Sequence, residues 1–136
     1  MVVASFVLVT FAAVSAAFHS IQRAMAETAA ASGVQVAASG TPGDPNTPYL
    51  AGAYAPTKNL LDSVMFGTTI EQGTGNQASC GQGLPDATIQ VCAYPDGALV
   101  GETIRGRPGF PIPWIDQLLP WKVDVTVEMH QVSYQP

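Results

Sequence analysis

The amino-acid sequence predicts an α+β fold in which a long N-terminal helix, apolar and then amphipathic, precedes a small antiparallel β-sheet head. Three observations support this prediction. Residues 1–18 contain no charged side chain. Residues 40–58 hold four prolines, and apolar and polar residues alternate in the C-terminal half. The pattern divides the 136 residues into a helix at 1–39, a connecting loop at 40–58 and a β-rich head at 59–136.

The first half of the predicted helix is apolar all round. Eighteen residues rise about 27 Å as a helix, close to the thickness of the hydrocarbon core of a bilayer. The segment is therefore long enough to span a membrane or to lie in an equally apolar protein core. Its many small residues would let such helices pack closely. The larger side chains expected on this assembly surface are Val3, Phe6, Val7, Val9, Phe11, Val14 and Phe18.

A secretory signal peptide is the alternative interpretation of this segment. Ala24-Met25-Ala26 resembles a cleavage site of the small-x-small type. A signal peptide begins with positive charge, however, and the first cation here is Arg23. The absence of positive charge before this residue favours a helix that stays in the mature protein.

The helical pattern continues beyond residue 18. Ile21, Met25 and Ala29 recur every four residues in an Ala-rich segment, which predicts an amphipathic helix at 19–39. Gly33 weakens the pattern locally, and Gly40 is a suitable stop. We therefore predict one continuous helix from about residue 2 to about residue 38.

The proline-containing connection at 40–58 is expected to be extended and rich in turns. A short helix is expected at 58–66, where four apolar residues fall at helical spacing, and Gly67 would end it.

A β-hairpin is predicted next. Residues 87–94 alternate apolar and polar side chains, and residues 98–104 are the expected partner strand. Pro95-Asp96-Gly97 between them is a strong turn signal.

The longest predicted strand covers residues 121–134. Its alternation shifts by one residue near His130 and Gln131, which predicts a β-bulge there. The half-polar pattern indicates an antiparallel sheet with one face in water. The apolar face is expected to pack on the second half of the helix.

Cys80 and Cys92 are the only cysteines. If the head lies outside the cytoplasm, a disulfide between them is the natural interpretation, and two separate buried thiols are the alternative. Their spacing matches no redox motif and no metal motif.

Composition argues against several functions. Five Lys and Arg against ten Asp and Glu give a net charge of −5, too few cations for nucleic-acid binding. The sequence contains no His/Cys cluster that would predict a metal site, and it contains no cofactor motif. A Ser133, His130 and Asp124 set would lie on one strand, so an exposed strand histidine is favoured. We expect the protein not to be an enzyme.

The chain resembles type IV pilin-like proteins, in particular the TadE/TadG-like pilins of tight-adherence systems. The resembling segments are VVASFVLVTFAAVSAAF, IQRAMAETAAASGVQVAA and GFPIPWIDQLLPWKVDVTVEMHQVSYQP. Pilins commonly carry a glutamate at the fifth mature position, where Ser5 stands here, so the charge that pairs with a neighbouring N-terminus during assembly is missing. The resemblance also implies a basic leader removed before Met1.

The resemblance implies a structural subunit of an extracellular type IV-like pilus. Such a subunit forms a helical homo-oligomer through its N-terminal helix after an inner-membrane stage. The alternatives are a minor, membrane-retained pseudopilin or assembly factor and a single-pass membrane-anchored binding module.

Overall fold

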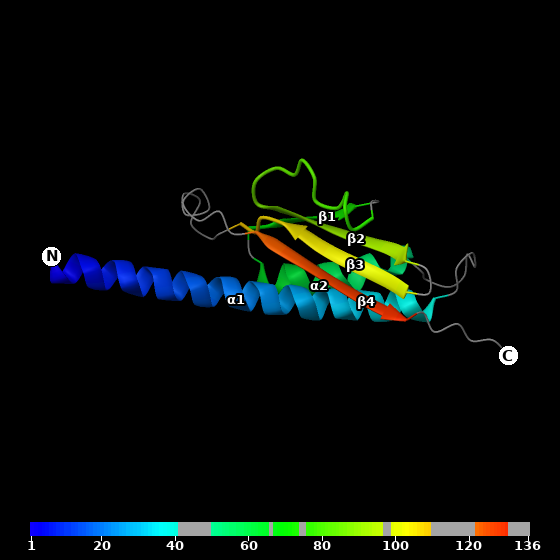
Figure 1. Cartoon of the computed structure of the whole chain (residues 1–136), viewed down its shortest axis with the longest axis horizontal. Helices are drawn as coiled ribbons and strands as arrows, with labels where there is room; N and C mark the ends of the chain where they lie inside the picture. The colour runs from blue at the N-terminus through cyan, green and yellow to red at the C-terminus, as the bar shows by residue number, and fades with distance from the viewer. Residues whose placement is uncertain (41–49, 66, 74–75, 97–98, 110–121, 131–136) are drawn as a thin grey trace.

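A computed structural model gives an α+β architecture in which one long helix packs on a four-stranded sheet (Figure 1). It describes residues 1–40, 50–65, 67–73, 76–96, 99–109 and 122–130. Its elements are α1 (Val2–Ser39), the 3-10 helix η1 (Leu50–Ala53), α2 (Tyr54–Val64), β1 (Thr69–Gly73), β2 (Thr88–Asp96), β3 (Leu99–Gly106) and β4 (Val123–His130).

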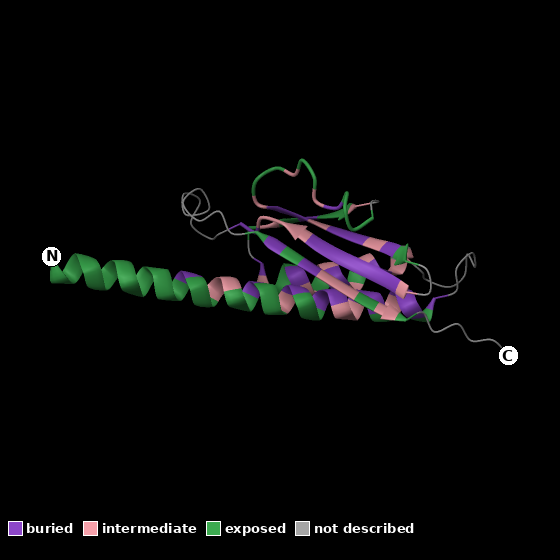
Figure 2. Ribbon diagram, in the orientation of Figure 1, coloured by how far each residue is buried: buried purple, intermediate pink, exposed green. Residues whose placement is uncertain are grey.

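Helix α1 is a single element of 38 residues, as the sequence predicted. It ends where Gly40 donates its backbone N–H to the Ala37 carbonyl at 3.1 Å. Gly40 has an extended backbone (φ −80°), so the helix stops there without the left-handed glycine that commonly ends helices. The N-terminal half of α1 projects from the head, and its C-terminal half packs against it (Figure 2).

The predicted extended connection is wrong over residues 50–57, and the short helix begins earlier than residue 58. These residues form η1 and the first turn of α2. Pro56 is the third residue of α2. The first turn of a helix has no internal partner for its N–H groups, so a proline is tolerated there. Residues 41–49 lie outside the described part of the chain.

The predicted hairpin is formed by β2 and β3. Their register runs from Ile89 opposite Gly106 to Asp96 opposite Leu99. Pro95 and Asp96 therefore belong to the strand and not to the turn, where the sequence placed them; Gly97 lies outside the described residues.

The β3–β4 ladder is regular over its whole described length. It runs from Gly106 opposite Val123 to Leu99 opposite His130. There is therefore no extra residue up to His130. The remainder of the predicted bulge and strand, from Gln131 on, lies outside the described residues.

The sheet is mixed, which corrects the prediction of an antiparallel sheet. Strand β1 was not predicted, and it pairs in parallel with β2, from Thr69 opposite Thr88 to Gly73 opposite Cys92. The strand order is β1-β2-β3-β4. A parallel pair needs a crossover, and the segment after β1 supplies it.

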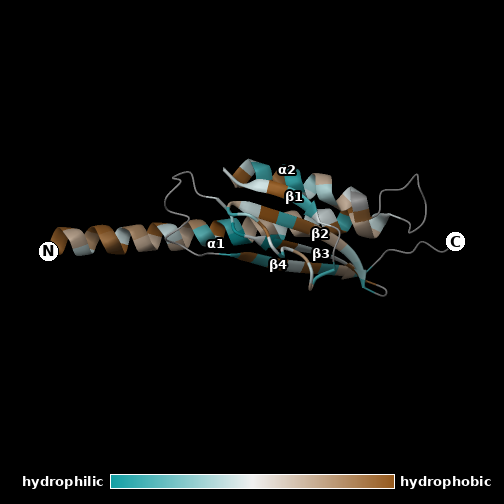
Figure 3. Ribbon diagram, turned by 90° about the horizontal axis from the view of Figure 1, so that it is seen from above, coloured by the Kyte–Doolittle hydropathy of each residue, from teal (hydrophilic) through white to brown (hydrophobic). Residues whose placement is uncertain are grey.

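Both helices cover one face of the sheet. Figure 3 shows α1 beneath β3 and β4, with α2 beside it on the side of β1 and β2. The predicted packing of the apolar face of β4 on the second half of α1 is confirmed, because α1 contacts β4 and small residues of α1 share one core cluster with Val123 and Val125. The core consists of Ala26, Ala29, Ala30, Leu61, Met65, Ile70, Ile89, Val91, Ile104, Val123 and Val125.

The opposite face is only partly in water, in contrast to the prediction. Thr103 on this face is completely buried. The segment that precedes β2 lies over it, because Gln77 and Thr126 hydrogen-bond at 3.4 Å and Cys80 is bonded to Cys92.

Candidate functional site

The first half of α1 is an exposed apolar surface. Among the predicted assembly residues, five have more than half of their surface exposed, whereas Phe11 is 39% exposed and Phe18 is half-buried. The five are Val3, Phe6, Val7, Val9 and Val14. Large apolar side chains on a soluble monomer are normally scattered, so an apolar surface of this extent marks a contact with a membrane or with other protein.

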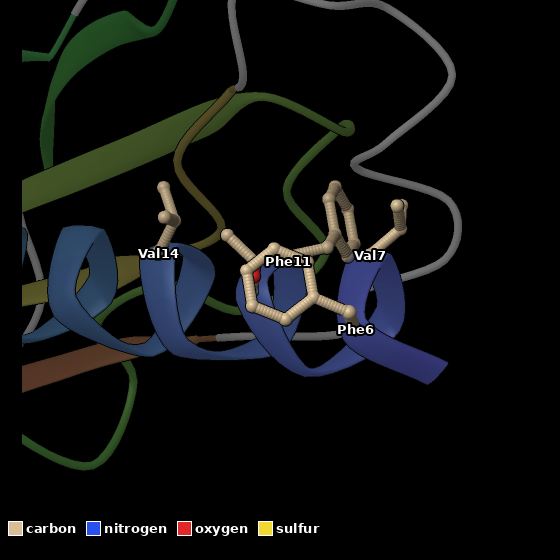
Figure 4. A pocket seen from close by; sticks show the side chains of 5 residues that line it. Phe6, Val7, Phe11 and Val14 are labelled. Carbon is tan, nitrogen blue, oxygen red and sulfur yellow. The ribbon is translucent and has the colours of Figure 1, made fainter. Parts of the chain in front are cut away.

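A groove on this surface is formed by side chains from successive turns of the helix. It has a volume of about 330 Å³ (Figure 4). Ridges and grooves of this kind are the features by which helices pack against one another. The lining residues are Phe6, Val7, Thr10, Phe11 and Val14.

By length and composition α1 could cross a membrane, and it is the one helix in the described part of the chain that meets this test. Near the N-terminus of α1, the hydroxyl of Ser5 is satisfied within the helix. Ser5 donates its hydroxyl to the Met1 carbonyl at 3.2 Å. The position at which pilins commonly carry a glutamate therefore offers no charge to a neighbouring chain.

A buried polar junction fixes α1 to the head. Glu102 on β3 faces the helices and is completely buried. Its Oε1 lies 2.6 Å from Thr57 Oγ1 on α2. Gly33 of α1 leaves the space for both groups, because a Cβ there would lie 2.0 Å from Glu102 Oε2 and 2.2 Å from Thr57 Oγ1. The three residues thus join α1, α2 and the sheet at one point.

The hydrogen-bond geometry of this junction favours a neutral Glu102. Thr57 Oγ1 also lies 2.9 Å from the Ala53 carbonyl and 3.1 Å from the Ala29 carbonyl. A hydroxyl carries one proton and can satisfy only one of these three acceptors. A protonated Glu102 would supply its own proton to the 2.6 Å contact and free the hydroxyl for a carbonyl.

Burial acts in the same direction. Removal of the carboxylate from water raises the pKa of Glu102 to about 8, against the lowering effect of the Thr57 hydrogen bond. Glu102 Oε2 has no hydrogen-bond partner among the described residues. An uncharged oxygen in that position costs far less than a charged one.

This junction was not predicted from the sequence, in which Gly33 indicates only a weak point in the helix. The signal for Glu102 was present, because Val100 and Ile104 flank it at period two and face the core. Alternation therefore places the carboxyl on the apolar face.

The expected disulfide joins Cys80 to Cys92, with the two Cα atoms 6.0 Å apart. It ties the Gly-rich segment to the middle of β2. Arg105 reinforces the attachment, because its Nη1 donates to the carbonyls of Gln77 at 2.6 Å and Cys80 at 3.0 Å.

The residues considered for catalysis do not form a site in the described part of the chain. His130 is exposed at the end of β4, whereas Asp124 lies near the start of that strand and accepts a hydrogen bond from Arg105 at 3.2 Å. Ser133 lies outside the described residues. Among those described, no group of three His, Cys, Asp or Glu side chains could hold a metal ion.

The architecture is pilin-like: a long apolar N-terminal helix is followed by a four-stranded sheet that carries a disulfide. Comparison with known protein families, with curated proteins and with solved structures gives no match to this chain.

Proposed function

We propose that the protein is a non-enzymatic structural subunit of an extracellular type IV-like pilus and that it polymerises through the apolar half of α1. One observation carries the proposal. An uncharged, exposed half-helix continues without a break into a half that is packed on the head. The head is thereby attached rigidly to a half-helix whose apolar surface must be removed from water.

The energetics favour close packing of copies. Each Å² of apolar surface removed from water contributes about 25 cal/mol. The apolar residues of the projecting half are more than half exposed over most of its length. Parallel helices from several copies would cover one another on all sides, whereas a single pairwise contact covers only one side. The contact is heterologous, so it propagates as a helix of subunits.

The cellular setting follows from two features. The exposed apolar helix and the disulfide together indicate a membrane-associated protein with an extracytoplasmic head. The chain would reside in the inner membrane through α1 before assembly and in the filament core afterwards. Both environments are apolar, so the same surface serves both stages.

The test compares filament yield with membrane content for variants of the full chain. Val9→Asp places a charge in the apolar half, at a cost of about 2.5–3.5 kcal/mol in a membrane and more in a packed core. Phe11→Ala keeps the segment apolar but removes one side of the groove. Val9→Leu is the matched control.

We expect filaments in sheared fractions of wild type and Val9→Leu and none with Val9→Asp. We expect Phe11→Ala to remain in the membrane with filament yield reduced about tenfold or more. Normal filaments from Val9→Asp would refute α1 as the polymer core. Recovery of the wild-type chain only from membranes would favour the membrane-retained pseudopilin, assembly factor or anchored binding module.

A further inference from the structure

A basic cleft lies at one end of the head. It has a volume of about 420 Å³ and is bounded by the segment after Cys80, the end of β3 and the start of β4. Three of the five Lys and Arg residues of the whole chain line it. They are Arg105, Arg107 and Lys122.

The walls of this cleft are held in place by covalent and polar contacts. Cys80 is fixed by the disulfide, and the Gly81 N–H donates to Gln90 Oε1 at 2.8 Å. Gly81 has φ +78°, and a Cβ there would lie 2.8 Å from the Arg105 side chain. Glycine therefore allows the arginine to lie directly against the backbone of the wall.

The charges of the cleft are only partly compensated. Arg105 Nη2 lies 3.2 Å from Asp124 Oδ1, and Arg107 Nη1 lies 3.4 Å from Asp86 Oδ1. Lys122 is exposed and forms no ion pair within the described residues. Among the described residues, three cations against two carboxylates leave this cleft positive.

The described residues at the other end of the same sheet carry two acidic side chains. Asp96 and Glu128 are exposed there, and Glu128 Oε1 accepts a hydrogen bond from the Tyr94 hydroxyl at 3.3 Å. Burial raises the pKa of Tyr94, and the charges of Glu128 and Asp96 add to this effect. Both carboxylates therefore lie close enough to the Tyr94 hydroxyl, near the end of β2, to affect its pKa.

The two ends are far apart in one copy and are aligned with α1. Gly106 at the basic end and Leu99 at the acidic end are seven residue steps apart along β3, roughly 23 Å. Val123 at the basic end belongs to the core cluster that holds Ala26, whereas Val100 at the acidic end belongs to the cluster that holds Ala37. The basic end therefore lies nearer the apolar half of α1, as Figure 1 shows.

We propose that the basic cleft binds the acidic end of a second copy of this chain, with Lys122 against Asp96 and Glu128. The inference rests on the proposed filament, in which α1 helices lie parallel and are staggered along the axis. Under that arrangement the basic end of one head faces the acidic end of the next. Complementary charge fixes the register of such a contact and disfavours the reversed orientation.

The first test is zero-length carbodiimide cross-linking of the full chain, in filaments and in membranes. The reagent condenses a lysine amine with a carboxylate to an amide and itself takes up the water. A Lys122 link to Asp96 or Glu128 must join two copies, given the separation within one copy. We expect this linked peptide by mass spectrometry, and we expect Lys122→Arg to lose it while filaments persist.

The second test is charge exchange. Lys122→Glu and Asp96→Lys should each lower filament yield about tenfold, and the double variant should recover to within about threefold of wild type. Glu71→Lys, an exposed reversal of the same sign as Asp96→Lys, and Lys58→Glu are the matched controls, and neither should change the yield.

The outcomes separate this inference from the proposed function. Filaments with no such Lys122 link, or equal effects of Glu71→Lys and Asp96→Lys, overturn the contact but leave the filament. Links without filaments refute the pilus and retain the contact between copies. Links from Lys122 to another molecule assign the cleft to a different occupant and overturn the inference.

Discussion

Replacement of Glu102 by glutamine should remove most of the loss of folding stability that occurs as the pH rises from 4.5 to about 8. The folded-state pKa of about 8 lies above the ordinary value of 4.5, so the unfolded state releases the proton first as the pH rises. Below pH 4.5 Glu102 is protonated in both states and does not lower the free energy of unfolding. This free energy then falls progressively as the pH rises to about 8. The loss is about 1.4 kcal/mol per pH unit, at most about 5 kcal/mol in total.

Glutamine has the size of glutamate and stays neutral. Its amide can donate to Thr57 Oγ1 in place of the carboxylic proton. Near pH 4 the two proteins should therefore differ by no more than about 1 kcal/mol. At pH 9 the Glu102→Gln variant should be more stable by several kcal/mol.

The assay is denaturant unfolding of the full chain in detergent, followed by circular dichroism from pH 4 to pH 9. Glu71→Gln is the matched control, because Glu71 is exposed on β1 and undergoes the same chemical change. The control should follow the wild-type pH profile. A stability difference between wild type and Glu102→Gln that stays constant with pH would show that the carboxyl is ionised in the fold.

Three further predictions concern the stability of the full chain, measured by denaturant unfolding in detergent. Gly33→Ala should cost about 2–3 kcal/mol, although alanine is the better helix former, because its Cβ would lie 2.0 Å from Glu102 Oε2; an unchanged or higher stability would contradict the close approach at the junction. Replacement of both Cys80 and Cys92 by alanine should lower the stability by about 2–3 kcal/mol, because the unfolded chain gains conformational entropy; an unchanged stability would show that the disulfide does not stabilise the head. Gln22→Leu should gain about 1 kcal/mol, since Gln22 is 1% exposed and its amide has no partner among the described residues; a loss would reveal a hydrogen bond to the amide.

The long helix and the hairpin could be predicted because their signals are local. The uncharged run and the Ala-rich continuation specify α1 from neighbouring residues alone. The alternation around Ile89 and Val91 likewise places both side chains in the core, where they lie. Each pattern reflects the period of its own element and needs no knowledge of its partners.

The errors arose where long-range packing decides the structure. Strand β1 has five residues, and Ile70 is the single buried side chain among them, so it carries almost no periodic signal. Its pairing with β2 is parallel and distant in sequence. Pro56 predicted a break in isolation, whereas its place in the first turn of α2 makes it harmless.

The candidate site was predicted only in part, for the same reason. Val3, Phe6 and Val9 could be identified from composition, because an apolar helix needs no partner to be recognised. The junction could not be identified, since Gly33, Thr57 and Glu102 are distant in sequence and meet only when the helices dock on the sheet. The basic cleft likewise combines residues from three separate segments.

The disulfide also limits how far the head can extend under tension. It closes a segment of 12 residues, each of which spans about 3.5 Å when fully stretched. If a pull along the chain unfolds the head, this loop stays closed and withholds roughly 35 Å of contour length. Single-molecule stretching should show that increment on reduction. Under oxidising conditions each unfolded head is therefore a shorter link in any fibre under tension.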